Sequence, residues 1–595
     1  MKRYSLLSTE GVAKTKALID IPLGRGQADL AVLNGTVLNV YTGEWIENPG
    51  ILIKGEWIVH VGLGLPEAVG PETSVIDARG KAVVPGLIEA HGHLADGLFS
   101  PEEFLRAAMP GGTTTIVTET IEPFPVRGEE GITDFLNAFR DQPIKVFATV
   151  PPLASTSRLC HGIPRETLRR LLLREDVLGL GESYWQAVLQ DPDTFLGPFK
   201  DTLQRGQKVE GHSAGAKGGN LSAYVTAGVS SCHEPTTAEE ALERLRLGLH
   251  VMIREGSVRR DMGAAVDLVR AGIDPRRIIL VTDGVRPVDL QEKGYMDHVV
   301  QTAIDRGIDP GLAIRMATIN PADYFGLDGF TGGIAPGRQA DLLILPGKSL
   351  IQPEMVISKG RVIARNGRLI TPPRRHAFAP ESLKSVHLPR AMTAEDFALT
   401  VPYPGSRVRV RVMDQITDLI TRERIVSVPV VNGQIHTDSG SDLLKVAAVE
   451  RRFLPGKTFV GLIRGFGLKT GAMACSAAWD TSDIVVVGEN EADMAEAVNR
   501  VHALQGGMVL CAAGKILAEI PLPIFGLMSD LPLPQLAGKI EDMTKQAKAL
   551  GFAFEDPHKT LVPLTGAAIP FLRLSEQGLV DIKTGNSVPL FVDTI

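Results

Sequence analysis

The feature that most constrains the fold is an alternation of short apolar runs with helical stretches, which repeats eight times after Lys81. Such an alternation predicts parallel β-strands joined by crossover helices. Eight units over about 250 residues match the size of a closed (β/α)8 barrel, which is predicted for residues 81–330. An open, doubly wound sheet is the alternative, and it is disfavoured because no Gly-x-Gly-x-x-Gly motif follows the first run. The eight runs are Ala82–His93, Thr113–Glu119, Lys145–Val150, Val177–Glu182, Gln207–His212, Gly228–His233, Leu249–Glu255 and Ile278–Asp283.

The chain of 595 residues is too long for one hydrophobic core, and its flanks differ in rhythm from the barrel region. Residues 1–80 contain an amphipathic helix at Ser8–Ile21 and then short β-like runs, which predict the first part of a small β-sandwich. Residues 331–371 return to that style and are expected to complete the sandwich, so that this domain is discontinuous. Residues 372–394, rich in Pro, Arg and His, are expected to be a linker, and residues 395–595 a C-terminal α+β domain. The predicted fold class is α/β.

Composition narrows the class of protein. Apolar residues make up 44% and charged residues 22% of the chain, as in an ordinary globular protein. The net charge of −7, without a stripe of Lys or Arg, argues against a nucleic-acid partner. The four cysteines are widely scattered and imply no disulfide framework, which fits a reducing cytoplasm. Since no apolar stretch reaches the roughly 18 residues that span a bilayer, we expect a cytoplasmic protein that does not enter a membrane.

Six side chains with metal-binding groups stand at the ends of the predicted barrel strands. In barrel enzymes these carboxyl ends converge on the active site. Any one of the histidines could have a structural role instead, but their shared position at strand ends favours a metal site. Histidine nitrogens and carboxylates suit borderline divalent metals such as Zn, Mn or Fe. The six residues are His91, His93, Glu182, His212, His233 and Asp283.

These ligands are too many for one tetrahedral ion and predict two ions that share a carboxylate and a water. We assign His91, His93 and Asp283 to one ion and His212 and His233 to the other. Glu182 is expected to bridge them, with Glu122 as the alternative bridge. The ions would lower the pKa of the shared water, and Asp283 could take its proton and pass it to a leaving group. The predicted reaction is hydrolytic attack on an electrophilic carbon, with Glu182 and Asp283 as the catalytic residues.

Several motifs resemble the bacterial adenine deaminase family of the amidohydrolase superfamily along nearly the whole chain. The strand-end motifs are common across the superfamily, whereas the motifs beyond residue 460 are much narrower and indicate the family. The matching motifs along the chain are Pro85-Gly-Leu-Ile-Glu-Ala-His-Gly-His93, Leu178-Gly-Leu-Gly-Glu182, Ser230-Ser-Cys-His-Glu234, Met316-Ala-Thr-Ile-Asn-Pro321, Gly467-Leu-Lys-Thr-Gly-Ala472 and Ile520-Pro-Leu-Pro-Ile-Phe-Gly-Leu527.

The resemblance implies hydrolytic deamination of adenine to hypoxanthine and ammonia by a hydroxide that bridges two divalent ions. Mn is the preferred metal, with Fe or Zn as alternatives. The family uses a glutamate at the fourth strand where many relatives use a carboxylated lysine, which supports Glu182 as the bridge. The implied partner is a small purine substrate. The N-terminal helix and the third domain offer surface for a homodimer or a higher homo-oligomer.

The chain departs from the family pattern at several positions near the expected substrate. After His93 the family usually has x-Glu-Ser-Ser, and this chain has Leu94-Ala95-Asp96-Gly97. Where the family has Asp-Pro-His-Glu, this chain has Glu119-Thr120-Ile121-Glu122. Where the family has Ala-His-Asp-Ser-His-Asn, this chain has Ala478-Trp479-Asp480-Thr481-Ser482-Asp483. The carboxylates at these three places are candidate substrate ligands, or else solvated loop carboxylates. Arg254 and Ser257, near the end of the seventh run, are candidates as well, or else pack at the barrel rim. The candidates are Asp96, Glu119, Glu122, Arg254, Ser257 and Asp480.

These departures keep two other functions open. One is a sister amidohydrolase that acts on another aminopurine or on a cyclic amide. The other is a non-enzymatic protein that binds a ligand or serves as a scaffold. The complete set of six ligands argues against the second, because loss of the proton shuttle would be the easy first step away from catalysis.

Overall fold

Eight parallel strands form the centre of the molecule in the computed structural model, which describes residues 4–62, 64 and 67–593. Five strands pair in the order β12-β11-β10-β9-β8 and three in the order β13-β14-β15. The two sheets meet where Ser230 N donates to Val209 O at 3.0 Å, and where Gly92 and Asp283 form a parallel bridge. The result is a closed barrel. Its strands are β8 (Leu87–Gly92), β9 (Thr113–Thr118), β10 (Lys145–Val150), β11 (Val177–Tyr184), β12 (Lys208–His212), β13 (Ser231–Cys232), β14 (His250–Arg254) and β15 (Ile278–Val281).

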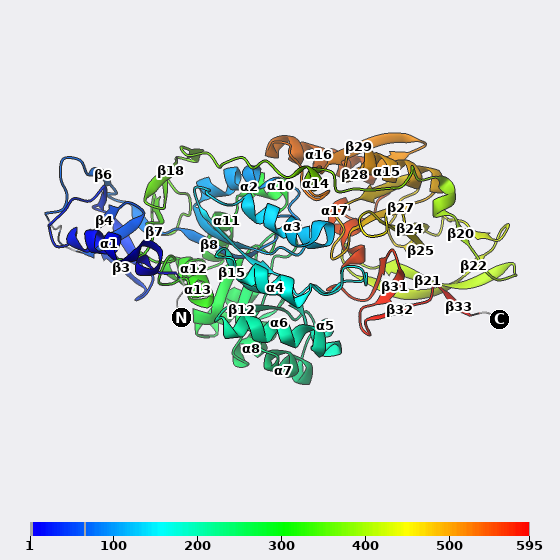
Figure 1. Cartoon of the computed structure of the whole chain (residues 1–595), viewed down its shortest axis with the longest axis horizontal. Coiled ribbons are helices and arrows are strands. Elements are labelled where there is room, and N and C mark those ends of the chain that lie inside the picture. The colour runs from blue at the N-terminus through cyan, green and yellow to red at the C-terminus, as the bar shows by residue number, and fades with distance from the viewer. Residues whose placement is uncertain (1–3, 63, 65–66, 594–595) are drawn as a thin grey trace.

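Helices connect these strands and surround the barrel (Figure 1). Their buried faces are apolar and their first turns are often capped by Ser, Thr or Asp, as expected of crossover helices. They are α2 (Pro101–Ala108), α3 (Pro123–Asn137), α4 (Arg165–Leu172), α5 (Trp185–Gln190), α6 (Pro192–Gln204), α7 (Gly218–Thr226), α8 (Ala238–Arg246), α9 (Met262–Arg270), α10 (Pro287–Lys293), α11 (Met296–Asp305), α12 (Pro310–Met316) and α13 (Ile319–Phe325).

The first predicted barrel strand, Ala82–His93, is wrong as a single element. It consists of β7 (Ala82–Pro85), which belongs to another sheet, and β8 in the barrel. The break falls at Gly86, where a Cβ atom would lie 2.2 Å from Thr114 Oγ1, so the chain can turn here only without a side chain. Pro85 cannot donate to a strand partner, which also favours a strand end.

Two sheets at one end of the molecule hold the strands that precede and follow the barrel (Figure 1). One has the order β5-β4-β1-β6 and the other β19-β18-β17-β16-β7-β2-β3. In the second sheet β16 runs antiparallel to β7, so both flanks of the barrel meet there. The domain boundaries at residues 80, 330, 371 and 394 stay a prediction. The elements are α1 (Leu6–Asp20), β1 (Leu30–Leu33), β2 (Thr36–Asn39), β3 (Glu44–Glu47), β4 (Gly50–Lys54), β5 (Trp57–Gly62), β6 (Ser74–Asp77), β16 (Leu342–Leu345), β17 (Met355–Ser358), β18 (Arg361–Arg365) and β19 (Arg368–Leu369).

The C-terminal region is built on a nine-stranded mixed sheet that lies at the opposite end of the molecule (Figure 1). Helix α15 packs on strands β26, β27 and β28 of this sheet. The elements are β20 (Leu399–Thr400), β21 (Arg407–Gln415), β22 (Thr421–Pro429), β23 (Gln434–Ile435), β24 (Leu443–Glu450), β25 (Thr458–Arg464), β26 (Ala472–Cys475), β27 (Asp483–Gly488), α15 (Glu491–Ala503), β28 (Gly507–Ala512), β29 (Lys515–Pro521), α16 (Leu533–Ala549), α17 (Pro557–Leu561), β30 (Leu572–Ser575), β31 (Gly578–Asp581), β32 (Asn586–Val588) and β33 (Phe591–Asp593).

The segment predicted as a linker is fastened to the barrel. It contains the short helix α14 (Pro380–Leu383), and Ser382 Oγ donates to Asp134 Oδ2 on α3 at 2.5 Å. The Arg374 guanidinium donates to the carbonyl oxygens of Asn137 and Arg140 at the end of the same helix. The segment therefore runs along the barrel, held by hydrogen bonds, from the sheets at the N-terminal end to the C-terminal region. Among the described helices, none is both long and apolar enough to cross a membrane.

Candidate metal centre and active site

Five of the six predicted ligands meet at one point at the carboxyl end of the barrel. Glu182 Oε1 lies 3.4 Å from His91 Nε2, 3.2 Å from His93 Nε2 and 3.1 Å from His233 Nε2. Asp283 Oδ1 faces the same three nitrogens at 3.5, 3.6 and 3.9 Å. Two carboxylate oxygens thus share three imidazole nitrogens. The sixth ligand, His212, stands to one side, with its ring centroid 5.3 Å from that of His233.

Local backbone irregularities aim these side chains. The pairing of β11 with β12 shifts register between Leu180 and Ser183, and such a bulge re-aims the residue within it, here Glu182. Asp283 has a left-handed backbone with φ of 66°, and its N–H donates to His91 O at 3.1 Å. Its own carbonyl accepts from His93 N at 3.2 Å. Asp283 is therefore tied through its backbone to both histidines of the first strand.

The chemistry of the donor set fits divalent cations. Although burial disfavours charge, the imidazoles of His212 and His233 hold the pKa of the Glu182 carboxyl well below its usual range. Burial alone would lower the pKa of His91, but the Asp283 and Glu182 carboxylates hold it well above its usual range. The cluster therefore attracts positive charge. His91 Nε2 and Glu234 Oε1 are buried and have no hydrogen-bond partner among the described residues. A metal ion would coordinate their lone pairs and so satisfy both atoms.

A second layer of carboxylates supports the outer nitrogens of the two first-strand histidines. Glu122 Oε1 lies 2.8 Å from His93 Nδ1, on the far side of the ring from Glu182. His91 Nδ1 faces two buried glutamates, Glu119 at 3.8 Å and Glu210 at 3.6 Å. Such outer contacts fix the orientation and tautomer of a metal-binding imidazole. This position of Glu122 suits support of His93 better than a bridge between ions.

A cavity of about 350 Å³ opens above the cluster. Of the predicted substrate residues, Asp96, Glu122, Arg254 and Asp480 line it. Glu119 instead lies beneath His91, where its Oε1 accepts from Thr149 Oγ1 at 2.8 Å. Ser257 also lies elsewhere, since its hydroxyl donates to Asp289 Oδ2 at 2.5 Å and accepts from Arg286 N at 2.8 Å. The rim-packing alternative therefore holds for Ser257.

Arg254 is in direct contact with the cluster. Its Nη1 lies 3.1 Å from Asp283 Oδ2, and its Nη2 lies 3.2 Å from Asp261 Oδ2. One oxygen of Asp283 is thus paired with a guanidinium while the other faces the histidines. Because the pair is buried, the pKa of Asp283 is lowered by His233 and Arg254 against the effect of desolvation.

The C-terminal region supplies one wall of the cavity. Trp479 Nε1 donates to Asp96 Oδ1 at 2.9 Å, which joins that wall to the loop after β8. Tyr184 donates its hydroxyl to Asp480 Oδ1 at 3.0 Å, and Ala567 N donates to Oδ2 at 2.8 Å. Burial raises the pKa of the Asp480 carboxyl to about 7. Two consecutive residues thus anchor the C-terminal wall to the barrel, one to the loop after β8 and one to the end of β11.

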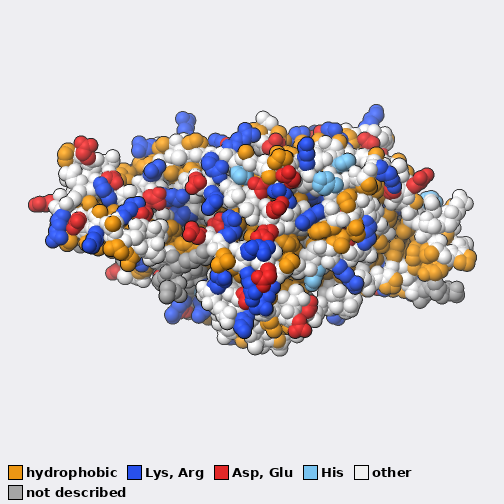
Figure 2. Space-filling model, in the orientation of Figure 1, with side chains coloured by type: hydrophobic (Ala, Val, Ile, Leu, Met, Phe, Trp, Pro, Cys, Tyr) orange, Lys and Arg blue, Asp and Glu red, His pale blue; other side chains and the backbone are white. Residues whose placement is uncertain are grey.

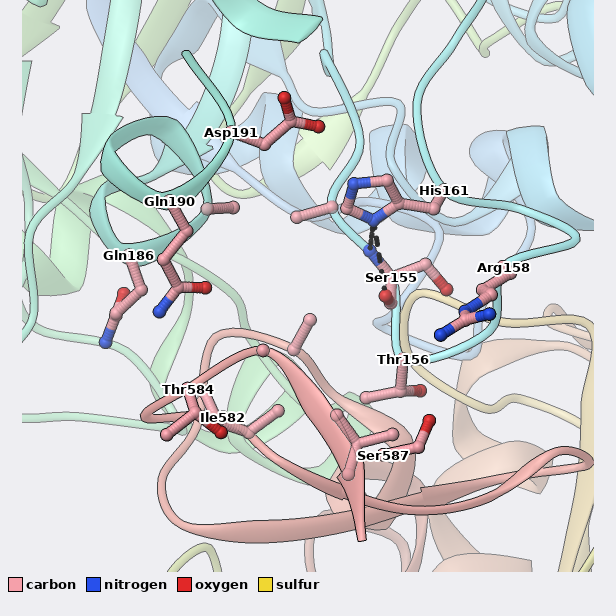
Figure 3. A pocket seen from close by; sticks show the side chains of 15 residues that line it. Ser155, Thr156, Arg158, His161, Gln186, Gln190, Asp191, Ile582, Thr584 and Ser587 are labelled. Carbon is pink, nitrogen blue, oxygen red and sulfur yellow. Dashed lines mark hydrogen bonds between the residues drawn. The ribbon is translucent and has the colours of Figure 1, made fainter. Parts of the chain in front are cut away.

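Figure 3 shows a second cavity, of about 280 Å³, between the loop after β10 and the C-terminal region. Side chains of Arg158 and His161 from the loop after β10 face Thr584 and Ser587 of the C-terminal region across it. Ser155, on the same loop, donates its hydroxyl to Asp480 O at 2.6 Å. This contact connects the loop to the wall of the metal cavity, but the second cavity contains none of the predicted site residues.

Sequence reasoning missed several residues of the site. Glu234 faces both His212 and His233, and its signal was its position directly after a predicted ligand. Glu210 was recoverable from the period of two along β12, which places it on the same face as His212. Tyr184 and Trp479 gave no such signal, since only the packing of the C-terminal region brings them to the cavity.

Comparison with known proteins shows which family of proteins the chain belongs to. Residues 82–366 match the amidohydrolase family, and residues 418–586 match the adenine deaminase C-terminal domain. The adenine deaminase of Moorella thermoacetica is 39% identical over 95% of this chain and 96% of its own length. Those of Clostridium botulinum (strain Langeland) and Cenarchaeum symbiosum are 32% and 35% identical, over 97% and 96% of this chain and 98% and 94% of their own lengths. The chain therefore belongs to the adenine deaminase family, which confirms the predicted resemblance.

Proposed function

We propose that the protein hydrolyses adenine to hypoxanthine and ammonia in the cavity above the histidine cluster. The observation that carries the proposal is the meeting of His91, His93 and His233 with Glu182 and Asp283, whose carboxylate oxygens lie within 3.9 Å of the three imidazoles, in a chain of the adenine deaminase family. One water is consumed, the C6 amine leaves as ammonia, and the ring keeps the oxygen.

Two divalent ions would be held by the six predicted ligands, with Mn preferred and Fe or Zn as alternatives. His91, His93 and Asp283 would hold one ion, His212 and His233 the other, and Glu182 both. Glu182 suits this role because its Oε1 is within 3.4 Å of three imidazole nitrogens. When bound, the ions would acidify a water and polarise the reacting carbon.

Asp283 is the proposed proton shuttle. Its Oδ2 is paired with Arg254, so its Oδ1, which faces the cluster, is the oxygen that would accept the proton of the attacking water. The same oxygen would pass that proton to the departing amine. Arg254 would keep the carboxylate ionised before the first transfer, and would hold the carboxyl in the same direction until the proton has passed on.

The cavity wall would recognise the purine. Trp479 and Tyr184 offer ring surfaces for a flat base, and Asp96, Glu122 and Asp480 offer groups for its nitrogens. Since the pKa of Asp480 is about 7, its carboxyl could donate to a ring nitrogen or accept from a ring N–H. Pairing of these nitrogens would distinguish adenine from rings that lack them.

A sister activity on another aminopurine or on a cyclic amide is the second candidate. The observation that favours it is Asp96, which lines the cavity within the segment 94–97, where the chain departs from the usual family pattern. Its carboxylate is held by Trp479 and could face a substrate group other than those of adenine.

A panel experiment separates the two candidates. Mn-loaded protein would be incubated with adenine, other aminopurines and cyclic amides, and ammonia and products would be measured. The proposal expects hypoxanthine and ammonia from adenine, with the highest kcat/KM in the panel. If adenine yields no ammonia and another ring is hydrolysed, the sister activity replaces the proposal.

The predicted homo-oligomer and cytoplasmic location stay predictions. Helix α1 leaves Leu7, Val12 and Ile19 more than half exposed, which supports an interface between copies. On the face drawn in Figure 2, Lys and Arg side chains mix with Asp and Glu over the whole surface. This mixture supports a small-molecule substrate rather than a nucleic acid as partner.

A further inference from the structure

Glu234 stands beside the metal cluster in a role that the six predicted ligands leave unassigned. It follows His233 directly, yet its carboxylate turns back toward the cavity. Glu234 Oε1 lies 2.5 Å from His233 Nε2 and 3.5 Å from His212 Nε2. One donor atom from each of these three residues lies within 4.8 Å of the others, and all three residues are buried. The three donor atoms are therefore close enough for one ion to bind them all with small shifts of the side chains.

The contact between Glu234 and His233 is close but poorly directed for a hydrogen bond. Despite the 2.5 Å separation from His233 Nε2, Glu234 Oε1 has no properly directed hydrogen bond from any described residue. A shared proton needs the N–H to point at the oxygen, whereas a metal ion needs only that both lone pairs converge on it. A cation held by both atoms would satisfy their lone pairs without the directed N–H that this contact lacks.

The other oxygen of Glu234 is fixed by the protein. Oε2 accepts from Ser213 N at 2.8 Å and from Cys232 Sγ at 3.3 Å. These two contacts come from the ends of the fifth and sixth strands, and they leave Oε1 aimed at the two histidines. Such outer hydrogen bonds are typical of a metal-binding carboxylate, because they set its direction before the ion arrives.

The assignment of ligands to the two ions is also uneven without Glu234. The first ion has three residues of its own, His91, His93 and Asp283, and the second has only His212 and His233. Both share Glu182. We propose that Glu234 is a ligand of the second ion, which then has three residues of its own. This inference rests on the proposed two-metal function and deepens it.

Glu234→Gln tests the ligand role, since the amide keeps the size and one oxygen but is a poor metal ligand. Metal-free protein would be loaded with Mn(II), dialysed, and analysed for bound metal by mass spectrometry. Wild type is expected to keep about two ions per chain and the variant about one, with the weaker site losing at least about 100-fold in affinity. Two ions with an unchanged dissociation constant in Glu234→Gln would overturn the inference.

Glu240→Gln is the matched control. Glu240 lines the same cavity, but its Oε2 accepts from Thr236 Oγ1 and N at 3.3 and 3.1 Å rather than facing the histidines. This variant should keep both ions, and loss of one ion in it would also contradict the assignment. Circular dichroism of the metal-free proteins should be the same for all three, which shows that the fold is intact.

Metal content and activity separate this inference from the proposed function. If wild type holds two ions and Glu234→Gln one, the ligand assignment stands even when adenine yields no ammonia, and only the proposed function fails. If adenine is deaminated and Glu234→Gln binds both ions as wild type does, the proposed function stands and the ligand assignment fails.

Discussion

Asp283 concentrates the local constraints of the site in one residue. Its left-handed backbone is bound to the backbone of His91 and His93, and its side chain divides between Arg254 and the histidines. A non-glycine residue in this conformation costs about 1–3 kcal/mol unless the surroundings fix it, and here four contacts do so. The strain is thus placed at the residue to which the proposal gives the proton.

Replacement of Asp283 by Asn should separate metal binding from turnover. The amide keeps an oxygen for Arg254 but cannot accept a proton near neutral pH. Because Asp283 is also a proposed ligand of the first ion, the variant is assayed with excess Mn(II), which should keep that site largely filled while kcat for adenine falls by about 10²–10⁴-fold. Steady-state kinetics and metal analysis on the same sample measure both. Unchanged turnover would refute the shuttle. Asp261→Asn, at the other partner of Arg254, should lower kcat far less.

For single residues, the sequence allowed prediction where the position of a side chain follows from its place at the end of a strand. His91, His93, Glu182 and Asp283 were predicted to meet because strand ends converge in a barrel, and the structure brings them together, while their role as ligands stays a prediction. Glu119 and Ser257 were misplaced, because proximity in sequence to a strand end does not tell whether a side chain points into the cavity, below it or outward. Glu234 was missed because strand alternation predicts the opposite face for a neighbour of His233, although its position directly after a predicted ligand was a signal.

Among the elements, β14 carries a titratable group at the amino end of the barrel, far along the strand from Arg254. Its first residue, His250, packs at a tilt against Tyr324, with ring centroids 4.7 Å apart. Burial, with the charges of Arg277 and Lys208, lowers the pKa of His250 to about 4. The folded protein therefore keeps this imidazole neutral at a pH where the unfolded chain protonates it.

The pH dependence of stability follows from this shift. Between about pH 6.5 and about pH 4, the unfolded chain binds a proton at His250 that the folded protein does not bind. The free energy of unfolding therefore decreases as pH falls from about 6.5 to about 4, and it is independent of this group above that range. Since the ring is partly exposed, we expect a loss of about 1–2 kcal/mol by pH 4. His250→Phe keeps the ring on Tyr324 and should remove this part of the pH dependence.

Urea unfolding of wild type and His250→Phe near pH 7 and near pH 4.5 measures the difference. The variant should lose less stability than wild type between the two conditions. If both proteins lose the same amount, the titration of His250 contributes nothing and the prediction is wrong.

Element types were predictable wherever periodicity was long and ends were marked by turns. The third barrel strand matches its predicted bounds, and most others differ by one to three residues. The fusion of β7 with β8 was an error because Pro85 and Gly86 interrupt an apolar run that is buried on both sides of the break. The sixth strand shortened to Ser231–Cys232 because its first part follows Gly228, whose φ of 105° is incompatible with a strand.

Over the whole molecule, the barrel lies between the two sheets at the N-terminal end and the C-terminal sheet (Figure 1). The cavity lies between the barrel and the C-terminal region, since residues of both line it. The bond from Trp479 to Asp96 joins residues 383 positions apart, and that from Tyr184 to Asp480 joins residues 296 apart. The sequence carried the resemblance in this region but not these contacts, because packing between distant segments leaves no period in the chain. The C-terminal region thus completes the cavity.

The central claim is that adenine is deaminated by metal held at the barrel's histidine cluster. The direct test is to strip the protein of metal, titrate it with Mn(II), and follow ammonia and hypoxanthine from adenine at each addition. The account predicts negligible deaminase activity in the stripped protein. The activity should then rise with added Mn(II) and reach a plateau at about two ions per chain. Full activity without added metal, or no ammonia from adenine at the plateau of metal binding, would contradict it.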